Sequence, residues 1–215
     1  MTAAGPAGAA LPILAALALA ADAGPVDVAL EARGGRLLAR LDLRPAFPDE
    51  LRRTLGNGLT NVVALQVALL PWRGDEPAAV FVRVVDLRRD VWEGTWAVVV
   101  RDPQSPAGRR LTAASWEDLR DLLADERDVD LGPVSELRQR TWEVRVRVDV
   151  NPVSKELLDR TREFLANPPA GVRGGGAPSK SVLGAIAGAL LTRSEEGEAQ
   201  RFRSRAFTAR EVPER

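Results

Sequence analysis

Few side chains in this sequence offer catalytic chemistry, and the segment around Lys180 is the first to consider. The segment GGGAPSKS (174–181) has the G-x-x-x-x-G-K-S form of a phosphate-binding loop, except that Ser179 occupies the position of the second glycine. A side chain there crowds the backbone amides that must approach phosphate. No strand pattern precedes the loop, and too few residues follow it for a nucleotide-binding sheet. We therefore interpret residues 168–181 as a Gly/Pro-rich linker without a cofactor.

Acidic residues form two groups that could hold a metal or transfer protons. In ADERDVDLG (124–132), Asp128 and Asp130 have the spacing of calcium ligands, but leucines stand where such a loop needs its glycine and its terminal glutamate. We interpret this stretch as a solvated helix end and loop. Asp86 and Asp90, near Glu93, could form a carboxylate pair for acid/base catalysis. Paired carboxylates are common in a chain with 30 acidic residues, so their spacing alone predicts no site.

The absence of whole residue types narrows the remaining chemistry. The chain has no cysteine, histidine or tyrosine, which excludes Cys/His zinc sites, thiol nucleophiles and Ser-His-Asp triads. We therefore expect no catalytic, cofactor-binding or metal-binding residues. A carboxylate-dependent hydrolase is the one enzymatic alternative that we retain.

Tryptophans and C-terminal arginines are the candidate binding residues. The five tryptophans stand mostly at strand ends or in first turns of helices: Trp72, Trp92, Trp96, Trp116 and Trp142. They either cap a buried core or form an exposed surface that stacks on sugar or peptide. Arg201, Arg203 and Arg205 share one face of a predicted strand. They either bind an anionic surface or protect a sheet edge from aggregation.

Charge and composition limit the class of protein. Thirty basic and 30 acidic residues give a net charge of zero, which argues against nucleic-acid binding. With 45% hydrophobic and 28% charged residues, the chain is in the globular range. Almost all basic residues are arginine, and their scatter among acids is typical of a genome rich in G and C.

The first 23 residues have the pattern of an export signal. AGAALPILAALALAA (7–21) carries no charge, and Ala21-Asp22-Ala23 offers a small-x-small cleavage site before Gly24. The run would span roughly 22 Å as a helix, which is short of a bilayer core of roughly 30 Å. The region before it lacks Lys and Arg, so a buried Ala/Leu helix remains the alternative. We predict a cleaved signal peptide or N-terminal hydrophobic segment over 1–23.

Apolar residues alternate with the period of a sheet through most of the chain. This pattern predicts strands over 26–31, 36–44, 62–70, 80–88, 95–102, 142–150 and 201–209. The segment 62–70 is apolar on both faces, which predicts a central strand that ends at Pro71. The strand 142–150 alternates valines with charged residues. We expect its valines to face the core and its charges to face water.

Helix start and stop signals interrupt the strands at three places. We predict helices over 47–58, 115–125 with Ser115 as its N-cap, and 151–169. The fold class is therefore α+β, mainly an antiparallel β-sheet or sandwich of about seven strands with two to four packed helices. Residues 24–167 form the β-rich domain, and 182–215 complete it with a short apolar helix and a C-terminal strand.

The apolar helix VLGAIAGALL (182–191) contains Gly184-x-x-x-Gly188, a spacing that allows helices to approach closely. Ten residues rise only about 15 Å and cannot span a membrane. The helix packs on the core, lies in a bilayer interface or meets a partner.

The order of these elements resembles a known bacterial family. The segments that carry the resemblance are LDLRPAFPDELRRTLGNGL, VVALQVALLPW, VWEGTWAVVV, the Trp116 helix and VRVDVNPVSKELL. They are similar to the family numbered 4390 among the domains of unknown function, in which a turn like Asn57-Gly58-Leu59 leads into a long apolar strand. The Gly-rich segment 171–176 departs from that pattern. The resemblance implies a secreted or membrane-associated envelope protein of a Gram-negative bacterium, and it transfers no catalytic residues.

These observations favour an exported, periplasmic or membrane-associated protein that acts as a non-enzymatic binding or scaffolding module. We expect its partner to be another envelope protein, with no nucleic acid and with peripheral membrane contact as a further option. An accessory subunit of an envelope signalling or assembly system, docked through 182–191, is the alternative function.

Overall fold

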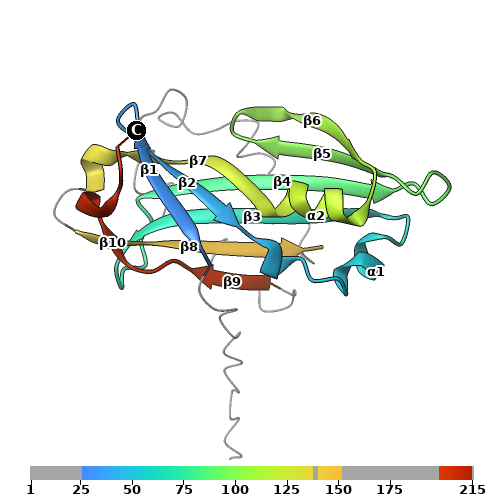
Figure 1. The fold of residues 1–215 in the computed structure, drawn as a ribbon, viewed down its shortest axis with the longest axis horizontal. Helices are drawn as coiled ribbons and strands as arrows, with labels where there is room; N and C mark the ends of the chain where they lie inside the picture. Colours follow the sequence, from blue (N-terminus) through green and yellow to red (C-terminus); the bar gives the residue numbers. More distant parts are fainter. Residues whose placement is uncertain (1–25, 138–139, 152–198, 215) are drawn as a thin grey trace, which may run out of the picture.

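Two antiparallel sheets, one of seven strands and one of three, make up the described part of the chain (Figure 1). The structure is a computed structural model, and it describes residues 26–137, 140–151 and 199–214. The predicted antiparallel β-architecture is confirmed. Helices are a smaller part of the described residues than the predicted α+β class implies.

The large sheet has the strand order β10-β8-β3-β4-β5-β6, and β9 also pairs with β8. Its strands are β3 (Thr60–Pro71), β4 (Ala79–Arg89), β5 (Trp96–Asp102), β6 (Ser105–Ala113), β8 (Thr141–Val150), β9 (Ala199–Arg203) and β10 (Phe207–Thr208). As predicted, β3 is central. It pairs with β4 on one side and β8 on the other, and it is buried along most of its length.

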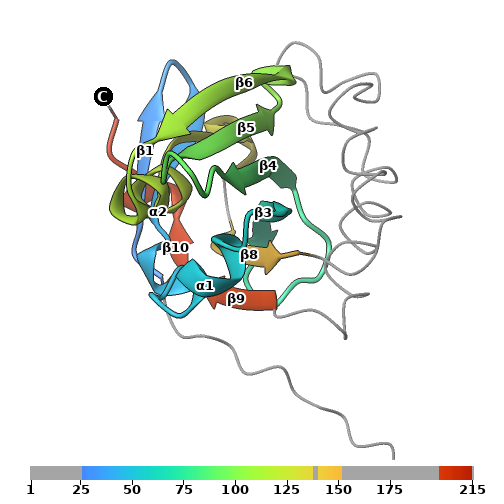
Figure 2. The same ribbon diagram turned by 90° about the vertical axis from the view of Figure 1, so that its right-hand side faces the viewer.

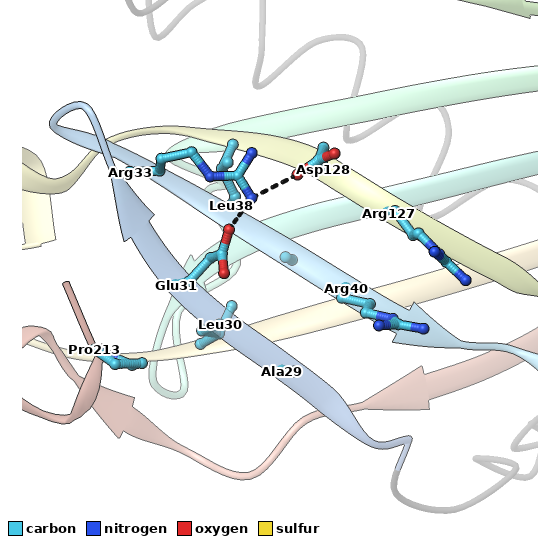
Figure 3. Close-up of a pocket in the computed structure, with 10 residues that line it drawn as sticks. Ala29, Leu30, Glu31, Arg33, Leu38, Arg40, Arg127, Asp128 and Pro213 are labelled. Carbon is cyan, nitrogen blue, oxygen red and sulfur yellow. Dashed lines mark hydrogen bonds and ion pairs between the residues drawn. The ribbon is translucent and has the colours of Figure 1, made fainter. Parts of the chain in front are cut away.

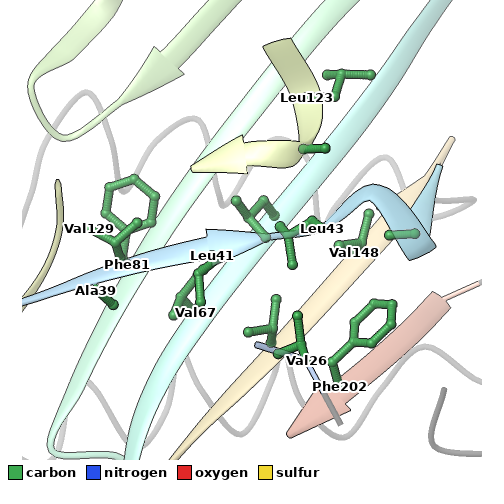
Figure 4. Packing of buried hydrophobic residues seen from close by; sticks show 14 of the residues in the cluster. Val26, Ala39, Leu41, Leu43, Val67, Phe81, Leu123, Val129, Val148 and Phe202 are labelled. Carbon is green, nitrogen blue, oxygen red and sulfur yellow. The ribbon is translucent and has the colours of Figure 1, made fainter. Parts of the chain in front are cut away.

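The small sheet has the order β1-β2-β7, with β1 at Val28–Arg33, β2 at Arg36–Asp42 and β7 at Asp125–Pro133. Figure 2 shows β1 and helix α2 (Trp116–Ala124) on one side of β3, β4 and β8. Alternation directs Leu37, Ala39 and Leu41 of β2 toward the large sheet. In Figure 4 Ala39 and Leu41 of β2 face Val67 of β3 and Phe81 of β4 across the core.

The helices are short, and one begins as its sequence predicts. In α2 the Ser115 hydroxyl accepts a hydrogen bond from the Asp118 backbone N–H at 3.0 Å, which confirms the predicted cap. Helix α1 covers only Leu51–Leu55 of the predicted 47–58. It ends at Leu55 because Gly56 and the turn at Gly58 (φ +81°) lead directly into β3. Three 3₁₀ helices complete the elements of the described residues, at Arg44–Ala46, Val134–Leu137 and Ala209–Glu211.

Two stretches that sequence periodicity did not predict are strands. The prediction of a solvated helix end and loop over 124–132 is wrong. These residues form most of β7, with Val129 and Leu131 in the core. Asp128 adopts a φ of +54° inside β7, and this irregularity breaks the period-2 signal. The strand β6 is mostly exposed and has no apolar alternation to reveal it. The predicted strand 201–209 is divided into β9 and β10.

The charged face of β8 is the largest departure from the sequence prediction. Val144, Val146 and Val148 lie in the core as expected. Arg147 and Asp149 on the opposite face are also buried rather than exposed to water. The Arg147 guanidinium donates two hydrogen bonds to the Asp149 carboxylate, at 2.7 and 2.9 Å, so the two buried charges compensate each other.

Several predicted segments lie outside the described residues. These are the N-terminal segment 1–23, all but the first residue of the helix 151–169, the linker 168–181 and the apolar helix 182–191. Within the part of the chain that the structure describes, no helix is long and apolar enough to cross a membrane.

Candidate functional site

The outer face of the small sheet carries a groove of about 480 Å³ (Figure 3). It is lined by Ala29, Leu30, Glu31, Arg33, Leu38, Ala39, Arg40, Arg127, Asp128 and Pro213. The strand period explains this face: Leu37, Ala39 and Leu41 direct their side chains to the core, so Leu38 and Arg40 direct theirs outward. The groove is open and combines a small apolar floor with charged walls.

At one end of the groove, two arginines share one carboxylate. The Arg127 Nε donates to Asp125 Oδ2 at 2.8 Å, and the Arg40 guanidinium approaches Asp125 Oδ1 at 3.5 Å. The hydrogen bond from Arg127 is the main cause that lowers the pKa of Asp125. Two guanidiniums therefore share the Asp125 carboxylate at this end of the groove. Both arginine side chains are more than half exposed, so a ligand can reach them.

The other end of the groove has the opposite charge balance. Arg33 forms ion pairs with Glu31 and, at 3.0 Å, with Asp128. One guanidinium therefore faces two carboxylates. In Figure 3 Leu38 lies beside Arg33, and Arg40 and Arg127 lie together further along the sheet. The groove is thus suited to a ligand that carries an apolar part and places an anionic group beside Arg40 and Arg127.

A second group of charges is buried between the two sheets. Arg83 of β4 forms ion pairs with Asp102 of β5, at 3.3 Å, and with Glu126 of β7. The Glu126 side chain is only 1% exposed. Burial outweighs the attraction of Arg83 and raises the pKa of the Glu126 carboxyl to about 7. The two carboxylates converge on Arg83, and neither is among the residues that line the groove. Their arrangement therefore links the two sheets through Arg83.

The acidic residues singled out in the sequence are not brought together. Asp86 pairs with Arg101, whereas Asp90 accepts hydrogen bonds from backbone N–H groups of its own turn. Asp128 pairs with Arg33, and Asp130 with Arg36. Among the described residues, no group of three acidic side chains has the geometry to hold a metal ion.

The chain matches no family model, no curated protein and no solved structure. The resemblance to the family numbered 4390 accordingly stays a prediction. The site has to be interpreted from its own geometry.

Three of the five tryptophans are buried, as the core-capping alternative predicts, and two are exposed. Trp96, Trp116 and Trp142 are buried, and the rings of Trp96 and Trp116 contact each other with centroids 6.3 Å apart. Trp92 and Trp72 are exposed at opposite ends of the large sheet, so no single stacking surface forms. Arg201 and Arg203 lie on β9, at an edge of the large sheet, whereas Arg205 follows the strand.

Sequence reasoning missed the groove itself. The alternation in β2 places Arg40 on an outward face, but Arg127 lies in the stretch predicted to be a loop. No pattern connects Arg40 with Arg127, since they belong to strands far apart in the chain. The antiparallel pairing of β2 with β7 brings them together.

Proposed function

We propose that this chain is a non-enzymatic binding module whose groove takes a carboxylate-bearing segment of a partner protein. The observation that carries the proposal is the pair Arg40 and Arg127, which share Asp125 beside an apolar floor. Guanidinium groups bind carboxylates through paired, charge-assisted hydrogen bonds. Leu38 and Ala29 can contact an apolar side chain of the same segment.

Binding is better supported than hydrolysis by the described residues. A carboxylate-dependent hydrolase needs two acids that face one accessible cavity. Glu126 and Asp102 face Arg83 instead, and Glu31 and Asp128 at the groove face Arg33. These carboxylates stabilise the fold or shape the groove.

The proposed setting is the envelope of a Gram-negative bacterium, where the partner is another exported protein. The resemblance to the family numbered 4390 supports the Gram-negative envelope. The signal-like pattern of residues 1–23 and the absence of cysteine support export. The alternative function, an accessory subunit docked through 182–191, depends on a segment outside the described residues.

The experiment is a charge reversal at the Arg40 and Arg127 end of the groove. A labelled peptide that alternates glutamate with valine is titrated against the wild type and against the double variant Arg40→Glu/Arg127→Glu, with fluorescence anisotropy as the readout. We expect the double variant to lose at least roughly tenfold in affinity, because two attractive charges become repulsive.

The matched control is Arg109→Glu/Arg110→Glu on the exposed strand β6, which makes the same change in charge away from the groove. It should retain wild-type affinity, and a peptide with glutamine in place of glutamate should bind weakly to every variant. Equal losses in the two double variants would show that only net charge matters, and the groove proposal would then fail.

A further inference from the structure

Three exposed apolar side chains gather at one end of the large sheet, away from the groove. Leu59 is 67% exposed, Val91 58% and Trp92 93%. Val91 and Trp92 lie in the turn between β4 and β5, and Leu59 lies between α1 and β3. The two segments touch, since a Cβ added at Gly58 would come within 3.2 Å of Val91 Cγ1. Figure 1 shows the β4–β5 turn projecting beyond the end of the sheet. We call Leu59, Val91 and Trp92 the apolar tip.

Hydrogen bonds fix the turn that presents Trp92. The Asp90 carboxylate accepts from the backbone N–H groups of Trp92, at 2.9 Å, and Glu93, at 3.1 Å. These hydrogen bonds lower the pKa of Asp90, with the one from Glu93 as the main cause. The Gly94 backbone N–H donates to the Asp90 carbonyl at 2.8 Å, and Gly94 supplies the positive φ of 72° that closes the turn. A turn fixed by hydrogen bonds therefore holds the Trp92 side chain in solvent.

The neighbouring loop is fixed in a similar way. The Asn57 side chain accepts a hydrogen bond from the Leu59 backbone N–H at 2.8 Å. The Asn61 side-chain amide donates to the carbonyls of Leu55 and Leu59, both at 3.0 Å. Two independent sets of polar contacts thus hold apolar side chains outward at one point, although their exposure is unfavourable in water.

We propose that the apolar tip inserts into the headgroup region of a lipid bilayer. Three side chains on a projecting tip bury far less than the roughly 1,200 Å² of a stable protein interface. A bilayer has no fixed shape to match, and the indole ring combines an apolar body with an N–H that suits the membrane–water interface. The end of β4 and the turn that follows it contain two basic residues, Arg88 and Arg89, and two acidic residues, Asp90 and Glu93. Their formal charges sum to zero. Insertion therefore depends on the apolar side chains and needs no anionic lipid.

The test measures cosedimentation of the full chain with vesicles at millimolar lipid. One set of vesicles is phosphatidylcholine alone, and the other contains phosphatidylglycerol in addition. We expect binding to both sets within a few-fold of each other. Trp92→Ala should lower the partition coefficient at least roughly fivefold, because the indole supplies most of the inserted apolar area.

The matched control is Trp72→Ala, which removes a tryptophan that is 46% exposed at the opposite end of β3. It should bind vesicles as the wild type does. Phospholipids brominated near the headgroup should quench tryptophan emission in the wild type and in Trp72→Ala, but much less in Trp92→Ala.

Three results would overturn the proposal. They are no cosedimentation of the wild type, equal partition of Trp92→Ala and wild type, and binding to anionic vesicles alone. The proposal is independent of the groove, since Arg40→Glu/Arg127→Glu should still bind vesicles.

Discussion

At the scale of single residues, Glu126 couples stability to pH. Its carboxyl has a pKa of about 7 in the folded protein against 4.5 in an ordinary environment. A raised pKa contributes stability that is complete below pH 4.5 and is lost as the pH rises through 7. The difference corresponds to roughly 3 kcal/mol. Arg83 and Asp102 face this carboxyl from the large sheet, and Asp125 precedes it on β7.

We therefore expect Glu126→Gln to flatten the pH dependence of stability. The free energy of unfolding, measured by urea denaturation at pH 5 and pH 8, should fall less with pH in the variant than in the wild type. The lost pH dependence should amount to about 3 kcal/mol or less. Parallel profiles of the two proteins would show that Glu126 does not titrate in this range.

For substitutions at Arg147, the structure predicts a larger loss of stability than the sequence pattern does. The alternation in 142–150 predicts a water-facing arginine, so Arg147→Asp should cost much less than Val148→Asp. The structure buries the Arg147 side chain to 1% exposure and pairs it with Asp149. We now expect both substitutions to destabilise the protein by about 3–5 kcal/mol, because each buries an uncompensated charge.

Arg110→Asp on the exposed β6 is the control, with an expected change within about 0.5 kcal/mol. Thermal melts compare the three variants, and a melt of Arg147→Asp close to that of Arg110→Asp would contradict the burial.

At the scale of elements, the start of α2 fixes how this helix meets the sheets. The Ser115 hydroxyl caps the helix, and the Trp116 indole N–H donates to Asp49 Oδ1 at 3.0 Å. Leu119 and Leu123, one and two turns further along, face the core. The helix therefore packs through a cap, an indole hydrogen bond and one apolar stripe.

Ser115→Ala should lower the free energy of unfolding by about 1 kcal/mol, since the backbone N–H of Asp118 loses its acceptor. Ser115→Asp should retain the wild-type value, because a carboxylate can accept the same hydrogen bond beside the positive end of the helix. Chemical denaturation measures both variants. An alanine variant as stable as the wild type would mean that the cap contributes nothing to stability.

At the scale of the whole molecule, the groove and the apolar tip lie on separate parts of the fold. The groove is built on the small sheet, and the tip belongs to the end of the large sheet. If both proposals hold, the module can contact a bilayer and a protein partner at the same time. Each contact is tested by variants that leave the other surface unchanged.

Export is the remaining prediction at this scale. The apolar run 7–21 and the Ala21-Asp22-Ala23 site predict a mature chain that begins at Gly24. Mass spectrometry of the protein from its native host should find this N-terminus. A chain that still begins at Met1 or Thr2 would contradict cleavage, and the alternative of a retained N-terminal helix would then stand.

The sequence by itself determined the features that depend on neighbouring residues. Apolar patterning identified β2, β3, β4, β5 and β8. The period of two also assigned the core-facing valines of β8, because successive side chains of a strand alternate between its faces. The Ser115 cap was equally local, since its acceptor and donor lie three residues apart.

Only the tertiary structure decided what lies opposite each face. A period shows that Arg147 and Asp149 share one side of β8, but their burial depends on the rest of the fold. The pairing of β2 with β7 creates the Arg40 and Arg127 site, and the packing of the two sheets raises the pKa of Glu126. Burial and electrostatic interaction depend on distances in space, and the local pattern of a chain carries no information on residues that are distant in sequence.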